Sequence, residues 1–425
     1  MPALNSSRRG FLRSVATLAA APLVLPGHVW AESPADKITL GFIGLGTQGR
    51  GLMNGFLNRD DVQVVAVCDC DRTRRDNGRK IVEDFYAKKT GAGGARCLAF
   101  TDFRDVLARP DVDAVVIATP DHWHAVIGVA AAEAKKDIYC EKPLTQSIAE
   151  ARALVRAVRR NSRVFQTGSQ QRSSPEFLKA CELVRNGAIG RIQEVHVAIG
   201  GPGVWCDLPA EEPEPGLDWN LWLGPAPFRA YHSELSPRGV HRHFPNWRRY
   251  REYGGGMVTD WGAHHFDICQ WGLGMDESGP VEVIPADKPG AQSGVTLIYP
   301  NGALVRHVEG NGVTFIGSDG RIFVNRGKFE PDRADLASYV PGTLKEKLHV
   351  STDHKGDWLD CVRRRRRPIC DVEIGARSVT VCHLVNLAYW HGQPMRWDPK
   401  ENTFAGGTGN PMWLDVSRRG PWGIG

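Results

Sequence analysis

Short apolar runs alternate with amphipathic stretches through residues 37–170, and this alternation predicts strands and helices. The runs ITLGFIG, VQVVAVCD, DAVVIATP, DIYCEKP and RVFQTGSQ are almost continuously apolar, as expected of strands buried on both faces. Stretches with a helical period, such as QGRGLMNGFLNR and SIAEARALVRAVRRN, separate them. Strand–helix alternation of this kind builds a parallel sheet with helices on both faces.

The second half of the chain shows a different pattern. Short strands with alternating polarity follow one another across Gly and Asn turns, without helices between them: RIQEVHVAIG, VEVIPADK, GVTLIYPN, GALVRHVEG, NGVTFIGSDG and GRIFVNRG. This order predicts an antiparallel or mixed sheet. Helical patterns follow in HKGDWLDCVRR and IGARSVTVCHLVNLAYWH. We therefore predict an α/β protein with two domains, residues 32–165 and 166–425.

A long segment inside the second domain, residues 201–253, has little periodicity and is rich in Pro, Trp and Arg. Long irregular loops in compact domains are usually functional. Its Trp and Arg side chains suit the faces and hydroxyls of a sugar. A packed surface cover or an arm for a partner fits the same composition, and the sequence does not separate these interpretations.

Composition and charge are those of a soluble globular protein. The 425 residues suffice for two domains, with 42% hydrophobic and 24% charged residues. The net charge of +5 is small and lies in local Arg clusters, so we predict no nucleic-acid partner. The run Arg363–Arg367 ends a predicted helix before Pro368, where cations suit the helix dipole. The ten cysteines are scattered without a CxxC pair, and we predict neither a disulfide nor a metal site.

The N-terminus predicts export. Twin arginines, Arg8 and Arg9, precede a weakly apolar stretch that is too short to anchor the chain in a bilayer, and a small residue follows at Ala31. We interpret residues 1–31 as a twin-arginine signal that is cleaved after Ala31, and expect a periplasmic or other extracytoplasmic protein with no membrane contact beyond this signal. A disordered basic tail is the alternative. The twin-arginine route carries folded proteins, usually to keep a cofactor that was acquired in the cytoplasm.

A GxGxxG motif follows the first predicted strand and opens a helix. Gly44 permits the tight turn, Gly46 lets a pyrophosphate approach the backbone, and Gly49 lets helix and strand pack closely. Asp69 lies 20 residues past Gly49, where it can accept hydrogen bonds from the adenosine ribose. This acid favours NAD over NADP, although nearby arginines could take a phosphate instead: Arg72, Arg74 and Arg75.

Two further stretches, ATPDHWH and CEKPLT, stand at strand ends, where ligands collect in such sheets. His122 and His124 flank Trp123 without acids or cysteines at ligand spacing, so we predict that they support the site rather than bind a metal. The predicted cofactor contacts are Gly44, Gly46, Thr47, Gln48, Gly49, Asp69, Thr119, Pro120, His122, His124, Glu141 and Lys142.

The stretch GGGMVTDWGAHHFDICQW, residues 254–271, puts titratable side chains where a core helix would be apolar. Asp260, His264 and Asp267 are spaced i, i+4 and i+7, which places them on one face of a helix. Such a stripe predicts that these three side chains line a site.

Together these motifs resemble the glucose-fructose oxidoreductase / inositol dehydrogenase / rhizopine-catabolism (Gfo/Idh/MocA) family. The twin-arginine leader, TPDHWH, CEKPL, QQRSS, DWNLWLGPAP and the 253–276 stretch look most like its exported bacterial branch. The resemblance implies a Rossmann domain followed by a domain whose large open sheet walls the substrate site and often forms an oligomer interface. It implies a homo-oligomer, a dimer or a tetramer.

The family's catalytic lysine matches Lys142, and its acid and histidine match Asp260 and His264. His264 could take the proton of a hydroxyl as hydride leaves, with Asp260 holding the ring and Lys142 bonding the reacting oxygen. Position and resemblance further predict substrate contacts from Gln170, Gln171, Arg172, Trp261 and His265, although His265 points about 100° away from His264 on a helix.

The resemblance implies hydride transfer between a secondary hydroxyl of a sugar, glycoside or cyclitol and a tightly bound NAD(P). The alternative is a glycoside hydrolase that uses transient oxidation at C3, elimination and water addition, so that no second substrate is needed. A sugar-binding protein without catalysis is a third interpretation, which the intact Lys142, Asp260 and His264 disfavour.

Overall fold

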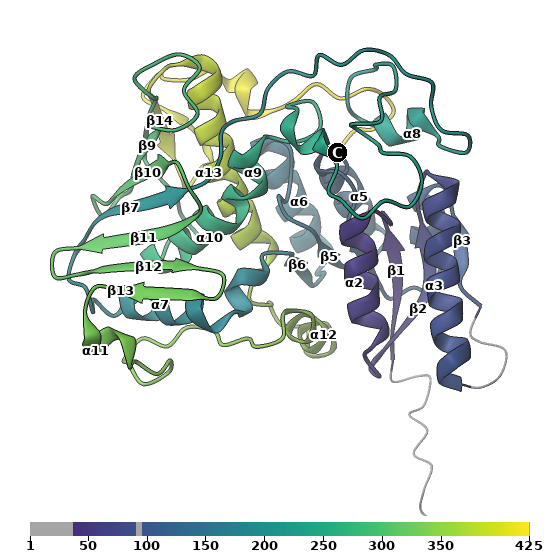
Figure 1. The fold of residues 1–425 in the computed structure, drawn as a ribbon, viewed down its shortest axis with the longest axis horizontal. Coiled ribbons are helices and arrows are strands. Elements are labelled where there is room, and N and C mark those ends of the chain that lie inside the picture. Colours follow the sequence, from purple (N-terminus) through teal and green to yellow (C-terminus); the bar gives the residue numbers. More distant parts are fainter. Residues whose placement is uncertain (1–36, 91–95, 425) are drawn as a thin grey trace, which may run out of the picture. The chain divides into compact units, whose positions relative to one another are not determined.

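Six parallel strands form the first sheet of the computed structural model, which describes residues 37–90 and 96–424. The strand order is β3-β2-β1-β4-β5-β6, the order of a dinucleotide-binding fold. The strands are β1 (Ile38–Ile43), β2 (Val62–Cys68), β3 (Leu98–Phe100), β4 (Ala114–Ile117), β5 (Asp137–Cys140) and β6 (Phe165–Thr167). The connecting helices are α2 (Thr47–Leu57), α3 (Arg72–Thr90), α4 (Phe103–Leu107), α5 (Asp121–Glu133) and α6 (Ile148–Arg160). The predicted Rossmann fold is confirmed (Figure 1).

Local sequence explains these elements. Leu40 and Phe42 of β1 are fully buried, as expected of a strand covered on both faces. The Ser147 hydroxyl accepts a hydrogen bond from the Glu150 N–H at 3.2 Å and caps the N-terminus of α6. The apolar stripe of α6 then packs Leu154 into the core.

The second sheet has nine strands in the order β13-β12-β11-β7-β10-β9-β8-β14-β15. Strands β7 and β10 pair in parallel, and the other neighbours that pair do so antiparallel, so the sheet is mixed, as predicted. The strands are β7 (Ile192–Ala198), β8 (Glu282–Ile284), β9 (Thr296–Ile298), β10 (Leu304–Val308), β11 (Gly312–Gly317), β12 (Arg321–Asn325), β13 (Lys328–Pro331), β14 (Met395–Asp398) and β15 (Thr403–Ala405).

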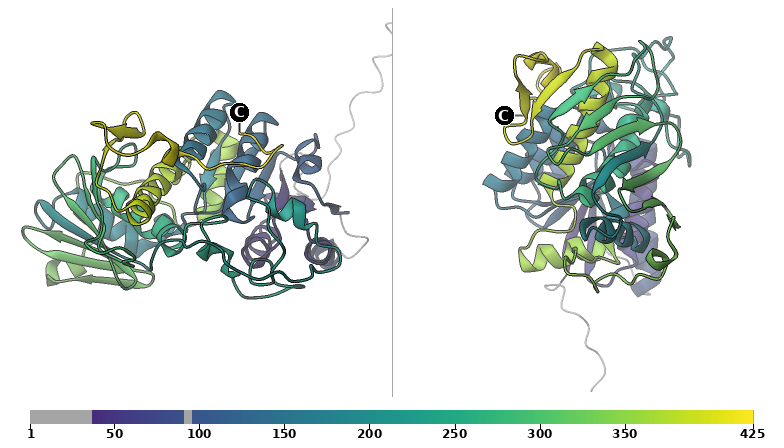
Figure 2. Two further views of the ribbon diagram at one scale, coloured as in Figure 1. Left: turned by 90° about the horizontal axis from the view of Figure 1, so that it is seen from above. Right: turned by 90° about the vertical axis from the view of Figure 1, so that its left-hand side faces the viewer.

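One face of this sheet packs on three helices, α7 (Pro175–Arg185), α10 (Gly262–Leu273) and α13 (Val372–His391), as Figures 1 and 2 show. Phe177 of α7, Phe266 of α10 and Leu384 of α13 share one buried cluster with Val195 and Phe315 of the sheet. The second half also contains α9 (Met257–Asp260), α11 (Ala334–Ala337) and α12 (His354–Arg364).

Helix α12 belongs to the second half of the sequence but packs on the first sheet's layer. Its Trp358 is fully buried edge-on against Phe56 of α2 and Tyr139 of β5, with ring centroids 5.7 Å from each. Arg365, just past the end of α12, pairs with Asp137 at 2.5 Å. The domain boundary at residue 165 therefore stays a prediction, because the chain returns to the first sheet after residue 353.

Segment 201–253 is irregular apart from α8 (Trp219–Leu223) and the short helix η3 (Asn246–Arg249). It has its own apolar cluster, which includes Trp222, Leu235, Trp247 and Tyr253. In Figure 1 this segment, drawn in teal, passes across the ends of α2 and α5.

The predicted signal, residues 1–31 with Arg8 and Arg9, lies outside the described residues. Within residues 37–90 and 96–424, none of the helices has the length and apolar character needed to cross a membrane.

Candidate active site

The glycine loop between β1 and α2 is shaped for a close ligand. Gly44 has a φ of +90°, and a Cβ there would lie 2.7 Å from the Ala118 carbonyl oxygen. A Cβ on Gly49 would lie 2.0 Å from the Gly44 carbonyl oxygen, so only glycine lets α2 pack this closely on the loop. A Cβ on Gly46 would meet nothing within 4 Å. Gly46 thus leaves open space at the N-terminus of α2, where a diphosphate binds in such folds.

Two more observations fit a dinucleotide at this loop. Asp69 lines the adjoining cavity, and its carboxylate accepts hydrogen bonds from the N–H groups of Leu45 (2.8 Å) and Asp71 (2.9 Å). Burial raises the pKa of Asp69, and the nearby Arg74 charge opposes this. The Thr119 hydroxyl is buried in the cavity wall without a partner among the described residues. A ribose and a nicotinamide arm would supply partners for both groups.

Two cavities adjoin along the carboxyl edge of the first sheet. The first, the cofactor cavity, runs from the glycine loop past Asp69 and Pro120 to the 201–253 segment. The second, the catalytic cavity, contains the CEKP loop and the 254–271 stretch. They share the lining residues Gln48, Ala118, Thr119, Phe244 and Arg248. A cofactor that extends from one into the other would reach the catalytic side chains.

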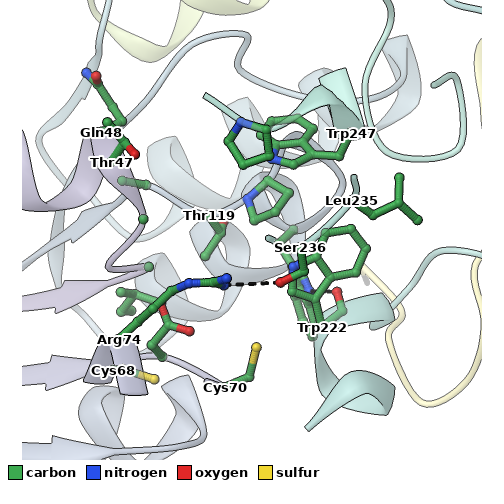
Figure 3. Close-up of a pocket in the computed structure, with 18 of the residues that line it drawn as sticks. Thr47, Gln48, Cys68, Cys70, Arg74, Thr119, Trp222, Leu235, Ser236 and Trp247 are labelled. Atoms are coloured by element: carbon green, nitrogen blue, oxygen red, sulfur yellow. Dashed lines mark hydrogen bonds between the residues drawn. The ribbon is translucent and has the colours of Figure 1, made fainter. Parts of the chain in front are cut away.

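Segment 201–253 forms one side of the cofactor cavity. Figure 3 shows Trp222, Leu235, Ser236 and Trp247 facing Thr47, Gln48 and Thr119. Arg74 crosses between the sides and donates a hydrogen bond to the Ser236 hydroxyl at 3.1 Å. Arg74 is engaged by this segment, and Arg75 bonds the Thr101 hydroxyl at 2.5 Å, so two of the three arginines considered for a 2′-phosphate already have partners within the chain. This supports NAD as the cofactor.

Lys142 and Asp260 form the centre of the catalytic cavity. The Lys142 ammonium donates to the Asp260 carboxylate at 2.5 Å and to its main-chain carbonyl at 3.0 Å, and both side chains stay about one-sixth exposed (16% and 17%). Arg248 lies 3.7 Å from the same carboxylate. Burial alone would raise the pKa of Asp260, but the Lys142 and Arg248 charges outweigh it and hold that pKa below its usual value. Asp260 is therefore ionised.

His264 lies one turn after Asp260 and lines the same cavity. Its side chain is buried, and its Nδ1 has no hydrogen-bond partner among the described residues. Burial, with a smaller contribution from the Lys142 charge, lowers the pKa of His264 well below its usual value. The ring is neutral, which is the form that accepts a proton.

Asp121, the first residue of α5, is a lining residue that the sequence analysis missed. It is 2% exposed and lines the catalytic cavity. Burial raises the pKa of Asp121 well above its usual value, and the Arg248 charge only partly opposes this. Burial therefore favours the protonated form of Asp121. Its place directly after Thr119 and Pro120, at a strand end, was the signal available in the sequence.

Other lining residues come from both halves of the chain. Glu141, Gln170 and Trp261 line the catalytic cavity, as expected from the sequence, and Arg326 packs its guanidinium 4.7 Å from the Trp261 ring centroid. Burial raises the pKa of Glu141, opposed mainly by the Lys142 charge. Arg248 and Phe244 come from the irregular 201–253 segment and Arg326 from a strand turn, where no pattern in one sequence indicated them.

The two histidines of TPDHWH have different places. His124 lines the catalytic cavity, and its ring nitrogens lie 2.8 Å from the Pro143 carbonyl and 2.9 Å from the Thr119 carbonyl, so it ties the two loops together. Burial lowers the pKa of His124 to about 4. His122 lines neither cavity: its Nε2 lies 3.0 Å from the Trp222 carbonyl. The predicted cofactor contact of His122 is thus corrected to a contact with segment 201–253.

Three predicted substrate contacts are also corrected, because their side chains turn into the core. Arg172 is 1% exposed and pairs with Asp267 at 2.8 Å and Asp276 at 2.7 Å. Gln171 is buried beside it and lines neither cavity. His265 is fully buried and contacts the Asn311 side chain at 2.7 Å. In the single turn Gln170–Ser173, only Gln170 faces the cavity.

Two family models match most of the chain. Residues 38–169 match the Gfo/Idh/MocA model described as "Oxidoreductase family, NAD-binding Rossmann fold". Residues 205–424 match the companion model "Oxidoreductase family, C-terminal alpha/beta domain".

Individual relatives match over shorter stretches. Levoglucosan dehydrogenase of Pseudarthrobacter phenanthrenivorans is 42% identical over 121 residues, which cover 28% of this chain and 30% of that protein. A glycosyl hydrolase family 109 protein of Shewanella woodyi is 28% identical over 158 residues, 37% of this chain and 33% of that protein. The matched stretches thus span about a third of each relative's length.

The fold is shared over a longer stretch. The WlbA dehydrogenase of Bordetella pertussis, solved in complex with NADH and UDP-GlcNAcA, aligns with a TM-score of 0.59 and 16% identity. The alignment covers 85% of this chain and 99% of that one.

Proposed function

This chain belongs to the Gfo/Idh/MocA oxidoreductase family, and we propose that it uses NAD to oxidise a secondary hydroxyl of a sugar, glycoside or cyclitol. The observation that carries the proposal is the convergence of Lys142, Asp260 and His264 in a cavity that shares its wall with the cofactor cavity. The similarity to levoglucosan dehydrogenase supports a carbohydrate substrate.

His264, Lys142 and Asp260 each have a separate role in an alcohol oxidation. The neutral His264 ring, which lines the catalytic cavity, accepts the hydroxyl proton. Lys142 donates a hydrogen bond to the reacting oxygen and stabilises its developing charge, while the ionised Asp260 holds the ammonium in place. NAD, when bound, accepts the hydride from the carbon that carries this oxygen.

A redox-neutral glycoside cleavage is the second candidate, and Asp121 favours it. That reaction oxidises C3, removes the C2 proton, eliminates the aglycone, adds water and returns the hydride. Elimination needs an acid for the leaving oxygen as well as a base. Asp121 and Asp260 line one cavity, and their pKa values are shifted in opposite directions, which is the arrangement that separates an acid from a base. The similarity to a family 109 glycosyl hydrolase points the same way.

The test combines nucleotide identification with single-turnover chemistry. Purified full-length protein is denatured, and any released nucleotide is identified by mass spectrometry. The native protein is then mixed with 1,6-anhydro sugars, methyl glycosides, p-nitrophenyl glycosides and cyclitols while absorbance is followed at 340 nm. Reduction of the bound nucleotide by one of these classes supports the oxidoreductase.

Two other outcomes change the conclusion. Release of p-nitrophenol without net NADH would make the glycoside cleavage the main function. A protein that binds NAD but neither reduces it nor releases an aglycone with any of these classes contradicts both.

We also propose that the protein is exported through the twin-arginine route. The support is the sequence pattern of Arg8, Arg9 and the apolar stretch before Ala31. Cell fractionation tests this: the wild type is expected outside the cytoplasm in shortened form. The double variant Arg8→Lys and Arg9→Lys is expected to stay inside at full length. Equal distribution of both proteins would contradict export by this route.

The outer face of the nine-stranded sheet supports self-association. Leu304, Val308, Ile316 and Phe323 are only half-buried there, on the face opposite the helices. We propose that this face pairs with a second copy of the chain. Light scattering after gel filtration is expected to give a dimer or tetramer for the wild type and a smaller species for Phe323→Glu. An unchanged mass for the variant would place the interface elsewhere.

A further inference from the structure

We propose that the catalytic cavity selects a sugar that carries a carboxylate, and that Arg326 is the residue that binds this group. The inference rests on the proposed alcohol oxidation in this cavity and adds to it the charge of the substrate. It follows from the cations of the cavity, because one of them has no carboxylate to pair with among the described residues.

Three cations line the catalytic cavity: Lys142, Arg248 and Arg326. Two of them face the same carboxylate. Asp260 accepts from the Lys142 ammonium at 2.5 Å, and the Arg248 Nε lies 3.7 Å from the same oxygen. Arg326, in the turn between β12 and β13, forms no ion pair with the described residues. One carboxylate thus serves two of the cations, and the third is left over.

The other titratable groups of the cavity do not supply the missing partner. Asp121 and Glu141 line it, but burial raises the pKa of both, so the site disfavours a negative charge on either. Burial lowers the pKa of His124 to about 4 and that of His264 well below its usual value, so both rings are neutral. A negative charge brought by a ligand is therefore favourable beside Arg326.

An aromatic ring, not an acid, holds the Arg326 guanidinium in place. The guanidinium lies 4.7 Å from the Trp261 ring centroid, which is a cation–π contact. Stacking of this kind fixes the plane of a guanidinium and leaves the N–H groups at its edge for other acceptors. Partial burial lowers the pKa of Arg326, and the charges of Asp260 and Glu141 only partly oppose this. The side chain is nevertheless exposed, so a ligand that enters the cavity can reach it.

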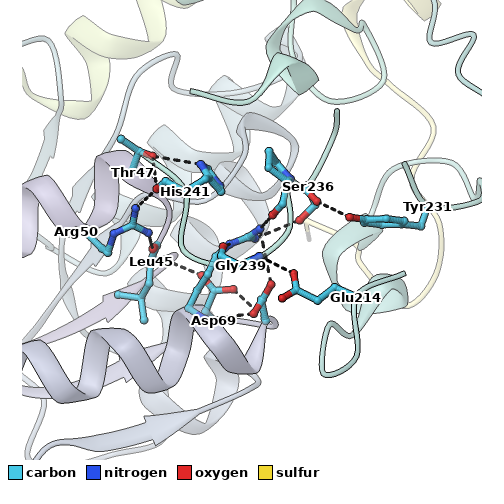
Figure 4. Close-up of polar contacts among 12 residues, drawn as sticks. Leu45, Thr47, Arg50, Asp69, Glu214, Tyr231, Ser236, Gly239 and His241 are labelled. Atoms are coloured by element: carbon cyan, nitrogen blue, oxygen red, sulfur yellow. Dashed lines mark hydrogen bonds and ion pairs between the residues drawn. The ribbon is translucent and has the colours of Figure 1, made fainter. Parts of the chain in front are cut away.

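The arginines beside the cofactor cavity differ from Arg326. Arg50 donates to the His241 carbonyl (Figure 4). Arg74 donates to the Ser236 hydroxyl at 3.1 Å and to two main-chain carbonyls. Their guanidinium groups are engaged by the chain itself. The Arg326 guanidinium makes no hydrogen bond with the described residues, and its donors are available to a substrate.

A carboxylate suits these donors better than a sugar hydroxyl does. A planar guanidinium can donate two parallel hydrogen bonds to the two oxygens of one carboxylate, and these bonds are charge-assisted. A hydroxyl offers one oxygen and no charge. When the C5 carboxylate of a hexuronic acid binds Arg326, the hydroxyls across the ring are free to face Lys142 and His264, which line the same cavity.

The carboxylate takes no part in the chemical step. The hydride still leaves the carbon that carries the reacting hydroxyl, and the proton of that hydroxyl still goes to His264. Arg326 acts through binding and orientation, and it raises the affinity for an acidic sugar over a neutral one. An exposed cation at the cavity also attracts an anionic substrate from solution.

The experiment compares acidic sugars with uncharged forms of the same sugars on the full-length protein. Methyl glycosides of glucuronic, galacturonic and mannuronic acid are assayed for nicotinamide reduction beside their methyl esters. The ester keeps the shape of the sugar and removes the charge, so the pair isolates the carboxylate. For at least one uronide we expect kcat/KM to exceed that of its ester about tenfold, the lower end for a hydrogen bond to a charged group, because Arg326 is exposed.

Arg326→Met should abolish this preference. The KM for the uronide should rise about tenfold, and the KM for the ester and both kcat values should change little, since Arg326 does not touch the reacting atoms. Arg326→Lys should keep part of the preference, because it retains the charge but not the paired donors. Arg321→Met is the matched control: this arginine is exposed at the start of β12 and lines neither cavity, so the variant should behave like the wild type.

Calorimetric titration gives a readout that does not depend on turnover. The free uronic acids are titrated into protein saturated with NAD, with the corresponding neutral hexoses in parallel. One uronate should bind the wild type about tenfold more tightly than it binds Arg326→Met. Added salt should weaken the binding of the uronate and leave that of the hexose unchanged, because salt screens the charge of an exposed arginine.

The possible results separate this inference from the proposed function. Equal kcat/KM for each uronide and its ester, or a preference that survives in Arg326→Met, would overturn the inference and leave NAD-dependent oxidation intact. Absence of uronate binding would overturn it as well. A protein that binds a uronate through Arg326 but reduces no nicotinamide with any sugar would support the acidic ligand and overturn the proposed function instead.

Discussion

Two clusters of cations and carboxylates each include an aspartate of the 254–271 stretch, Asp260 in one and Asp267 in the other. They differ in how many of their hydrogen-bonding groups have partners within the chain. Lys142 and Asp260 form a pair at a cavity wall, each about one-sixth exposed. Arg172 pairs inside the core with Asp267, the two side chains being 1% and 0% exposed, and also with Asp276, which is 29% exposed. Ser378 adds a hydrogen bond to Asp267 at 2.7 Å.

This difference separates the residues that serve catalysis from those that serve stability. In the core cluster, the Asp267 carboxylate accepts from both Arg172 and Ser378 and is fully buried, so it is not accessible to a ligand. In the cavity cluster, His264 and Asp121 line the same cavity as the pair, and the His264 Nδ1 has no partner among the described residues. We infer that the same residue types serve catalysis where they are left incomplete and serve stability where they are complete.

The largest effect is expected in the cavity cluster, which contains Lys142 and Asp260. Lys142→Met should reduce single-turnover nicotinamide reduction by about 10²- to 10⁴-fold, since it removes the donor to the reacting oxygen. It should also raise the pKa of Asp260, because the Lys142 charge is the main influence that lowers that pKa. Thermal stability and NAD content should change little.

The matched control is a lysine–aspartate pair on the surface. Lys80 and Asp84 are 2.9 Å apart and largely exposed, so Lys80→Met should change neither turnover nor stability measurably. Full turnover in Lys142→Met would remove this residue from the catalytic group.

The core cluster of Arg172, Asp267 and Asp276 should respond in the opposite way, with a loss of stability and no loss of substrate binding. Arg172→Met leaves Asp267 buried without its cation and should lower the free energy of unfolding by about 3–5 kcal/mol. The folded fraction should keep the KM of the wild type, because Arg172 lines neither cavity. Urea titration and steady-state kinetics on the same preparation measure the two effects. A raised KM with unchanged stability would restore the substrate contact expected from the sequence.

The same comparison shows what a single sequence could predict. The fold class, the glycine loop and the places of Asp260 and His264 followed from patterns within short stretches: alternation, a motif after a strand and helical spacing. The role of Lys142 came from the family resemblance. The helical spacing was wrong for Asp267, which lies in the core and not at the cavity. Arg172 was misplaced because its position at a strand end is the same for a ligand contact and a core ion pair. Its partners Asp267 and Asp276, 95 and 104 residues later, decide between them.

Segment 201–253 marks the other limit of prediction. Its composition suggested contact with a sugar, a surface cover or an arm. The structure places its Trp222 and Trp247 against the cofactor cavity instead. The contacts that position it are to main-chain carbonyls, such as those of Pro237 and His241, which carry no sequence signal.

A smaller effect is expected at Asp121, which lines the same cavity as Lys142 and Asp260. Asp121→Asn keeps a hydrogen-bond donor and should cost about tenfold in turnover, less than removal of an acid–base group usually costs. The wild type should lose activity as rising pH ionises Asp121, and the variant should lack this alkaline limb. Asp105→Asn, at an exposed carboxyl, is the control.

Stability provides a readout for Asp121 that is independent of turnover. Its pKa is raised in the folded state, so folding favours the protonated form and stability falls as pH rises through that pKa. Asp121→Asn removes this dependence and should become more stable relative to the wild type as pH rises. Parallel stability curves for the two proteins would show that Asp121 carries no buried proton.

The smallest effect is expected at Ser378, which belongs to the core cluster. Ser378→Ala removes one of the hydrogen bonds to Asp267 but leaves both oxygens bonded to Arg172. The cost should be only about 1 kcal/mol in the free energy of unfolding, well below that of Arg172→Met, because no buried charge loses its partner. Turnover and NAD content should match the wild type. Ser338→Ala, at an exposed serine, sets the baseline. If Ser378→Ala lowered turnover at full stability, the two clusters would be coupled through α10, and catalysis and architecture would not be separate on this stretch.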